Sequence, residues 1–124
     1  MIRLLALVLM SIASAAFAAE QAQTVPPRFQ GAWNTNLKHC GTALDDSRLI
    51  ISANRIKFYE SGGPIRAVVT RGQFDLALIV ELSGEGETWL SYSYFRLSSD
   101  HASITSINEG EPGMVRYRCP RGAK

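Results

Sequence analysis

The sequence predicts an all-β domain, a small antiparallel up-and-down barrel of eight strands. Clusters of Gly, Pro, Asn, Asp and Ser recur every 8–14 residues along residues 28–124, as in turns between short strands. Apolar and polar residues alternate between those clusters, most clearly over residues 74–82. After residue 18, Gly or β-branched residues interrupt every window of helical periodicity. We expect one domain over residues 28–124, with an open β-sandwich as the alternative arrangement.

Residues 1–18 have the pattern of a secretory signal peptide. Arg3 precedes an apolar run over residues 4–10, and the segment ends in Ala16-Phe17-Ala18, an A-x-A cleavage pattern. The run is too short for a transmembrane helix, which needs about 20 apolar residues. We therefore expect cleavage after Ala18 and a soluble periplasmic or secreted protein with no membrane insertion.

The remaining chain divides into a lead-in and eight expected strands. Residues 19–27 are polar, end in Pro26-Pro27 and are expected to form a flexible N-terminal segment. We expect turns at residues 61–64, 83–87 and 108–113, and a tight hairpin at Ala53-Asn54. The expected strands cover residues 29–36, 48–52, 56–60, 65–70, 74–82, 88–97, 102–107 and 114–119. Closing these strands into a barrel removes exposed edges, and strands this short favour a filled interior.

The chain contains two cysteines, Cys40 and Cys119. In an exported protein they allow one intramolecular disulfide. That bond closes a loop of about 80 residues, which the chain-entropy model values at about 4–5 kcal/mol. A free thiol pair and an intermolecular bridge are the alternatives. No His or Cys stands at metal-ligand spacing beside either residue, so we expect no metal site.

Composition and motifs argue against nucleic acid binding and catalysis. The chain has 13 Lys and Arg and 11 Asp and Glu; the leader carries one of these, Arg3, which leaves a net charge of +1. Such a balance does not favour nucleic acid as a partner. The two histidines are His39 and His101, and the consecutive Ser99-Asp100-His101 is no catalytic triad, because triad residues converge from separate segments. We expect no enzyme activity and no cofactor.

Two groups of residues are candidates for binding a partner. Acidic residues cluster in two predicted turns, where a basic protein could bind if both turns lie at one end of the barrel. Solvated hairpin tips are the alternative explanation. Tyr92 and Tyr94 share a strand face opposite Trp89, where they either line a pocket or form sheet surface. The acidic residues are Glu85, Glu87, Glu109 and Glu111.

The segment Phe29–Trp33 reads F-x-G-x-W and resembles the first strand of a lipocalin-type barrel. In that superfamily the Trp of the Gly-x-Trp motif closes the barrel base, and a basic residue near the last strand packs over it. The resemblance implies this arrangement for Gly31 and Trp33, with Arg116 or Arg118 forming the cation–π contact.

Small exported barrels are also similar to this chain. Bacterial metalloprotease inhibitors begin with the same motif and insert the segment before the barrel into the protease cleft. That resemblance implies an inhibitory role for residues 19–28, although the cysteine spacing differs from that family. Small periplasmic lysozyme inhibitors match in compartment and size. Exported proteobacterial proteins of unknown activity resemble nearly the whole mature chain, at residues 29–33, 57–61, 84–89 and 117–120.

We therefore favour a monomeric exported barrel that binds or inhibits another protein in the cell envelope. The alternative is a binder of a small apolar ligand in the barrel mouth. A cavity with convergent polar groups would favour the ligand, and a filled barrel would favour the protein partner.

Overall fold

The computed structural model describes residues 18–122 and shows a closed antiparallel barrel of eight strands with one additional strand. The signal-peptide prediction lies outside the described residues, apart from Ala18. Within residues 18–122, no helix has the length and apolar character needed to cross a membrane. The all-β prediction and the up-and-down barrel are confirmed, and the strands do not form the open sandwich.

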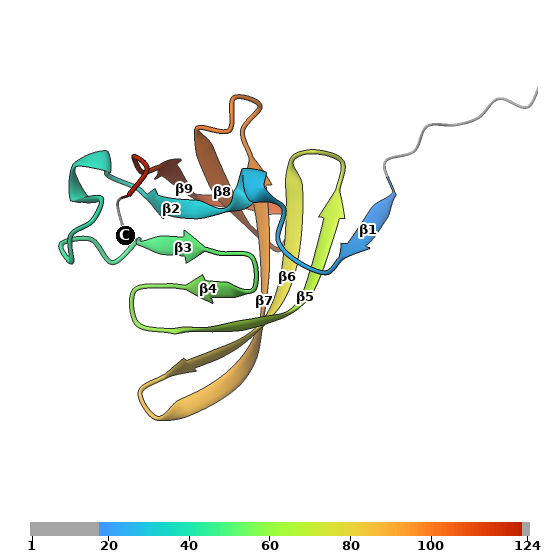
Figure 1. Cartoon of the computed structure of the whole chain (residues 1–124), viewed down its shortest axis with the longest axis horizontal. Helices are drawn as coiled ribbons and strands as arrows, with labels where there is room; N and C mark the ends of the chain where they lie inside the picture. The colour runs from blue at the N-terminus through green and yellow to red at the C-terminus, as the bar shows by residue number, and fades with distance from the viewer. Residues whose placement is uncertain (1–17, 123–124) are drawn as a thin grey trace, which may run out of the picture.

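The barrel follows the chain order (Figure 1). Around its circumference the strands are ordered β5-β4-β3-β2-β9-β8-β7-β6, and β6 pairs with β5 to close it. The elements are β1 (Ala19–Ala22), η1 (Pro27–Phe29), β2 (Gly31–Asn34), η2 (Leu37–His39), β3 (Leu49–Ile51), β4 (Arg55–Lys57), β5 (Gly62–Arg71), β6 (Asp75–Gly84), β7 (Glu87–Leu97), β8 (Ser103–Asn108) and β9 (Glu111–Arg118).

Three strands begin inside segments predicted to be turns, and one of them, β7, does so by a single residue, Glu87. β5 starts at Gly62, where residues 61–64 were expected to turn. A Cβ atom on Gly63 would lie 1.8 Å from the carbonyl oxygen of Glu81, so glycine lets these two backbones approach within the sheet. β9 starts at Glu111 because a two-residue turn is enough to reverse the chain. Glu109 and Gly110 have φ of 52° and 84°, as in a type I′ hairpin turn.

The N-terminal segment forms an additional strand where a flexible lead-in was expected. β1 pairs with β5 from Ala19 opposite Arg71 to Ala22 opposite Val68 (Figure 1). β5 has ten residues but pairs with β4 only over Gly62–Pro64, which leaves the rest of that edge open to β1. Val25 is fully buried and donates its N–H to the Ala53 carbonyl oxygen at 2.9 Å. The pairing was not evident in the sequence because β1 is polar and lacks apolar alternation.

Large side chains fill the barrel interior. Phe29, Trp33 and Phe95 are 0–2% exposed, and aliphatic side chains from β3 to β8 surround them. The Trp33 indole N–H donates to the Phe29 carbonyl oxygen at 3.2 Å, so its one polar group is satisfied inside the core. The barrel interior is therefore packed with side chains, and the loops and the outer faces of the strands are exposed to solvent.

Candidate functional site

Trp33 of β2 and Arg118 of β9 lie opposite each other where these two strands pair. The Arg118 guanidinium lies 4.1 Å from the centre of the Trp33 ring, a cation–π contact. It also donates to the backbone carbonyl oxygens of Gln30, Arg28 and His101 at 2.7, 2.8 and 2.9 Å. One side chain thus joins the start of β2, the end of β9 and the turn after β7.

Gly31 of the Gly-x-Trp motif makes room for this contact. Its φ is +132°, and a Cβ atom there would lie 3.1 Å from the Arg118 Nη1 atom. A larger residue would therefore strain the backbone and crowd the guanidinium. Of the two arginines proposed from the resemblance, Arg118 is the one placed over Trp33.

Arg116 has a different position, because its side chain turns into the protein. It is 8% exposed, and its Nε donates to the Ser47 carbonyl oxygen at 2.6 Å. Its Nη1 donates to the Ser106 hydroxyl at 3.0 Å. Burial lowers the pKa of Arg116 below its ordinary value. Arg116 therefore anchors the end of the long β2–β3 connection. The cation–π contact with Trp33 is made by Arg118.

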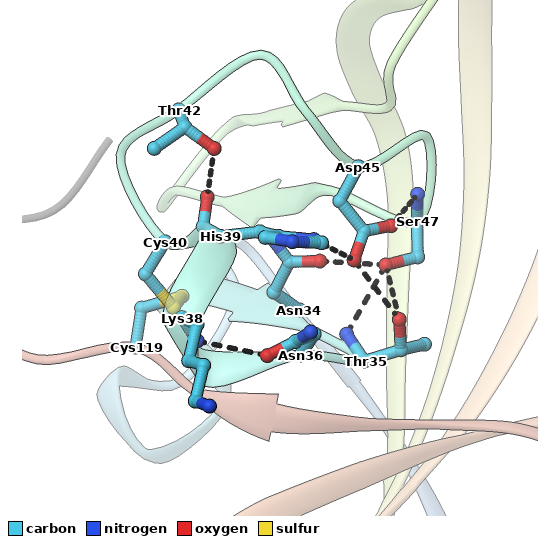
Figure 2. The surroundings of a disulfide bond; sticks show 10 residues. All are labelled: Asn34, Thr35, Asn36, Lys38, His39, Cys40, Thr42, Asp45, Ser47 and Cys119. Atoms are coloured by element: carbon cyan, nitrogen blue, oxygen red, sulfur yellow. Dashed lines mark hydrogen bonds and ion pairs between the residues drawn. A yellow bond between two sulfur atoms is a disulfide. The ribbon is translucent and has the colours of Figure 1, made fainter.

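The β2–β3 connection, which we call loop 35–48, is also held by the disulfide. Cys40 and Cys119 are bonded, as predicted, and are separated by 79 residues in the sequence (Figure 2). Cys119 donates its N–H to the Ala32 carbonyl oxygen at 2.8 Å, which ties the C-terminal side of the bond to β2. The Asn36 side chain accepts the Lys38 N–H at 3.0 Å and caps η2 inside the loop.

A polar network joins side chains within loop 35–48 to one another and to Asn34 of β2 (Figure 2). The Asp45 carboxylate accepts the Ser47 N–H at 2.8 Å and the Thr35 hydroxyl at 3.2 Å, and His39 Nδ1 lies 3.2 Å from it. The Ser47 hydroxyl donates to the buried Asn34 side-chain oxygen at 2.6 Å. Hydrogen bonds from Ser47, with smaller contributions from His39 and Thr35, lower the pKa of Asp45 to about 2. The network and the disulfide together fix a connection that lacks strand pairing.

Loop 35–48 carries two exposed leucines. Leu37 is 52% exposed and Leu44 is 77% exposed. A single exposed leucine is ordinary on a protein surface. These two stand on a long loop held by a covalent bond and several hydrogen bonds, and long ordered loops on rigid scaffolds are common sites of binding.

The acidic candidates lie in and beside the β6–β7 and β8–β9 turns. Successive turns of an up-and-down barrel alternate between its ends, so the β6–β7 and β8–β9 turns share an end. Glu85, Glu87, Glu109 and Glu111 are all exposed. The β6–β7 hairpin, however, extends away from the rest of the barrel (Figure 1), so a joint acidic surface stays a prediction.

The two candidate tyrosines do not form one pocket. Tyr92 is 65% exposed on the outer face of β7. Tyr94 is half-buried, and its hydroxyl donates to the Asp75 carboxylate at 2.6 Å. The Arg96 Nε donates to the same carboxylate at 2.9 Å. Tyr94 is therefore committed to a surface polar cluster, while Tyr92 is free to contact a partner.

Pockets open at several places within residues 18–122. One, of about 610 Å³, lies over β3 and β4 and includes Arg55, Lys57 and Tyr59 among its lining residues. Within the same residues, no group of three or more His, Cys, Asp or Glu side chains is placed to hold a metal ion.

Loop 35–48 is the site that our sequence analysis did not identify. A signal for it was present, because a long gap without strand alternation, residues 37–47, separated the first two predicted strands. One of the two cysteines, Cys40, lies in that gap. The network within the loop could not be predicted, because it also requires Arg116 from the opposite end of the chain.

Comparison of the chain with protein-family models, curated proteins and solved structures found no match in any of the three. The resemblances to lipocalin-type barrels, to bacterial protease and lysozyme inhibitors and to exported proteobacterial proteins remain predictions.

Proposed function

We propose that this protein is an exported binding module that recognises another protein of the cell envelope through loop 35–48. The observation that carries the proposal is the exposure of Leu37 and Leu44 on a loop anchored by a disulfide. The leader pattern of residues 1–18 and the disulfide support an oxidising compartment outside the cytoplasm.

The anchoring of the loop favours binding energetically. An ordered loop loses little conformational entropy when it binds, so more of the contact energy contributes to affinity. Burying one leucine side chain contributes about 1.5–3 kcal/mol. Leu37 and Leu44 together thus provide enough apolar contact for a small central anchor in an interface.

An enzyme with a concave active site is the class of partner that suits a protruding rigid loop, and inhibition is the expected consequence. The N-terminal segment is a less suitable inhibitory element. Residues 19–22 pair with β5, and Val25 is fully buried, so this segment is engaged in the barrel itself. The filled interior likewise supports a protein partner over a small apolar ligand.

The test is a panel of secreted proteases and cell-wall hydrolases, assayed for inhibition and for binding to the immobilised protein. We expect at least one enzyme to bind and to lose activity. Leu37→Ser with Leu44→Ser should then weaken binding at least 100-fold, because both apolar anchors are lost. The control is Tyr59→Ser with Phe74→Ser, which removes two side chains that are 44% and 39% exposed elsewhere.

Two outcomes would contradict the proposal. The first is a panel without any bound enzyme, and the second is an affinity that the leucine substitutions leave unchanged. If replacing the four acidic turn residues with Gln lowers the affinity and flattens its salt dependence instead, the acidic turns form the binding surface.

A further inference from the structure

One edge of β7 is unpaired over most of its length. β7 pairs with β6 along residues 87–96 but with β8 only from Phe95 to Leu97. Among residues 18–122, no strand pairs with the other edge of residues 88–94. Figure 1 shows the β6–β7 hairpin extending away from the rest of the barrel. We call residues 88–94 the free edge.

The backbone direction shows which groups face outward along the free edge. Leu97 donates its N–H to the Phe74 carbonyl oxygen on the β6 side of the strand. Backbone groups of successive residues in an antiparallel strand point to opposite sides. The N–H and C=O groups that point away from β6 therefore belong to Thr88, Leu90, Tyr92 and Tyr94.

The free edge lacks the features that normally protect an exposed edge. Its sequence is Thr-Trp-Leu-Ser-Tyr-Ser-Tyr, without a charged residue, a proline or a glycine. Natural edge strands are blocked by Lys, Pro, bulges or short length. Here Leu90 and Tyr92 are 70% and 65% exposed on the outer face. An uncharged strand with strong β-forming residues and outward backbone groups is suited to pairing with another strand.

We propose that the free edge pairs with the free edge of a second copy of this chain, in an antiparallel two-fold arrangement centred on Ser91. In this register Leu90 lies opposite Tyr92 of the second copy, and Thr88 lies opposite Tyr94 of the second copy. All outward N–H and C=O groups then meet as hydrogen-bonded pairs, while Ser91 faces its symmetry mate. The seven unpaired residues of each copy are thereby covered.

The composition of the edge favours a second copy as the occupant. The edge is complementary to itself, because the two-fold arrangement brings apolar residues together and opposes no like charges. Ile79 lies beside Tyr92 in the β6–β7 pairing and is 36% exposed. The row across the interface therefore runs from Ile79 through Tyr92 of one copy to Leu90 of the other, with Tyr92 between Ile79 and Leu90. A register shifted by one residue would place each residue with outward N–H and C=O groups opposite a residue whose N–H and C=O groups point toward β6. The hydrogen bonds between the two copies would then be lost.

The dimer is independent of the function proposed above, because loop 35–48 connects β2 and β3, whereas the free edge belongs to β7. Sedimentation velocity and light scattering of the purified disulfide-bonded protein test it. We expect a concentration-dependent species with the mass of two chains. Leu90→Lys with Tyr92→Lys places lysines opposite each other across the axis and should weaken association at least 100-fold. The matched control, Leu37→Lys with Leu44→Lys, also adds two charges at exposed leucines and should leave the dimer intact.

Cysteine substitutions at two serines test the register. In the proposed pairing Ser91 and its mate form a non-hydrogen-bonded pair with Cα atoms about 4.5 Å apart. This separation is within disulfide range, so Ser91→Cys should give a covalent dimer on mild oxidation. The corresponding Ser93 atoms would be offset by four residues, about 13 Å, and Ser93→Cys should not cross-link.

Three results would overturn the proposal: a single species of monomer mass at every concentration up to about 0.5 mM, a dimer that the lysine pair does not weaken, and equal cross-linking at Ser91 and Ser93. Circular dichroism and retention of the native disulfide verify that each variant is folded.

Discussion

Replacing Arg118 with methionine should destabilise the barrel strongly without altering its strands. The substitution keeps an unbranched side chain over Trp33 but removes the positive charge and every side-chain N–H donor. Three backbone carbonyl oxygens, those of Gln30, Arg28 and His101, then lose their partner. Water can reach part of this site, since Arg118 is only partly buried.

The expected loss follows from the contacts. Each hydrogen bond from a charged donor to a carbonyl is worth about 1.5–3 kcal/mol when buried, and about 1 kcal/mol is appropriate where water can replace the donor. The cation–π contact with Trp33 adds about 0.5–1 kcal/mol. The free energy of unfolding should therefore fall by about 3–4 kcal/mol, a large part of the 5–15 kcal/mol typical of a domain.

Urea unfolding followed by tryptophan fluorescence measures this loss. With a slope of about 1–1.5 kcal/mol per molar urea, the midpoint should fall by about 2–4 M. The matched control is Arg66→Met, which breaks an ion pair with Glu81 at 2.6 Å whose arginine side chain is 55% exposed. That pair should be worth less than about 1 kcal/mol. If Arg118→Met costs no more than Arg66→Met, Arg118 does not hold the barrel closed.

Two further predictions concern loop 35–48. Replacing both Cys40 and Cys119 with Ser opens a loop with a separation of 79 residues and should lower the free energy of unfolding by about 4–5 kcal/mol; reduction of the wild-type protein should produce the same shift in urea, and an unchanged midpoint would refute it. Hydrogen bonds from Ser47 hold the pKa of Asp45 at about 2, so its stabilising contribution is present above about pH 4 and is lost as the pH falls through 2. The difference in urea midpoint between wild type and Asp45→Asn should accordingly shrink from pH 5 to pH 2, and a constant difference would contradict this role.

The strand positions were largely predictable because they depend on local patterns. The alternation over residues 74–82 predicted β6, and the turn chemistry around it predicted its neighbours. The start of β5 was mispredicted because the Gly62-Gly63-Pro64 segment has the composition of a turn. Its extended form depends on the close approach of Gly63 to the Glu81 carbonyl, a contact between residues far apart in the sequence.

The candidate site was less predictable than the fold. The leader pattern predicts export, and the Cys40–Cys119 bond was predicted from the cysteine count and is confirmed, but the loop that the disulfide anchors was not predicted. Its shape depends on Arg116 reaching the Ser47 carbonyl, over a separation of 69 residues. Among the residues proposed for partner binding, Tyr94 also donates its hydroxyl to Asp75 on the neighbouring strand, a contact that the sequence did not predict.

The all-β class, the near-neutral charge, the order of the strands along the chain and the one possible intramolecular disulfide could be predicted without a structure, because they depend on composition and on periodicity within a few residues. Tertiary structure alone decided which arginine covers Trp33, that β1 pairs with the open part of β5, and that residues 88–94 of β7 have an unpaired edge. Those outcomes depend on strand length, register and curvature around the closed barrel, where backbone groups distant in the chain compete for the same partners.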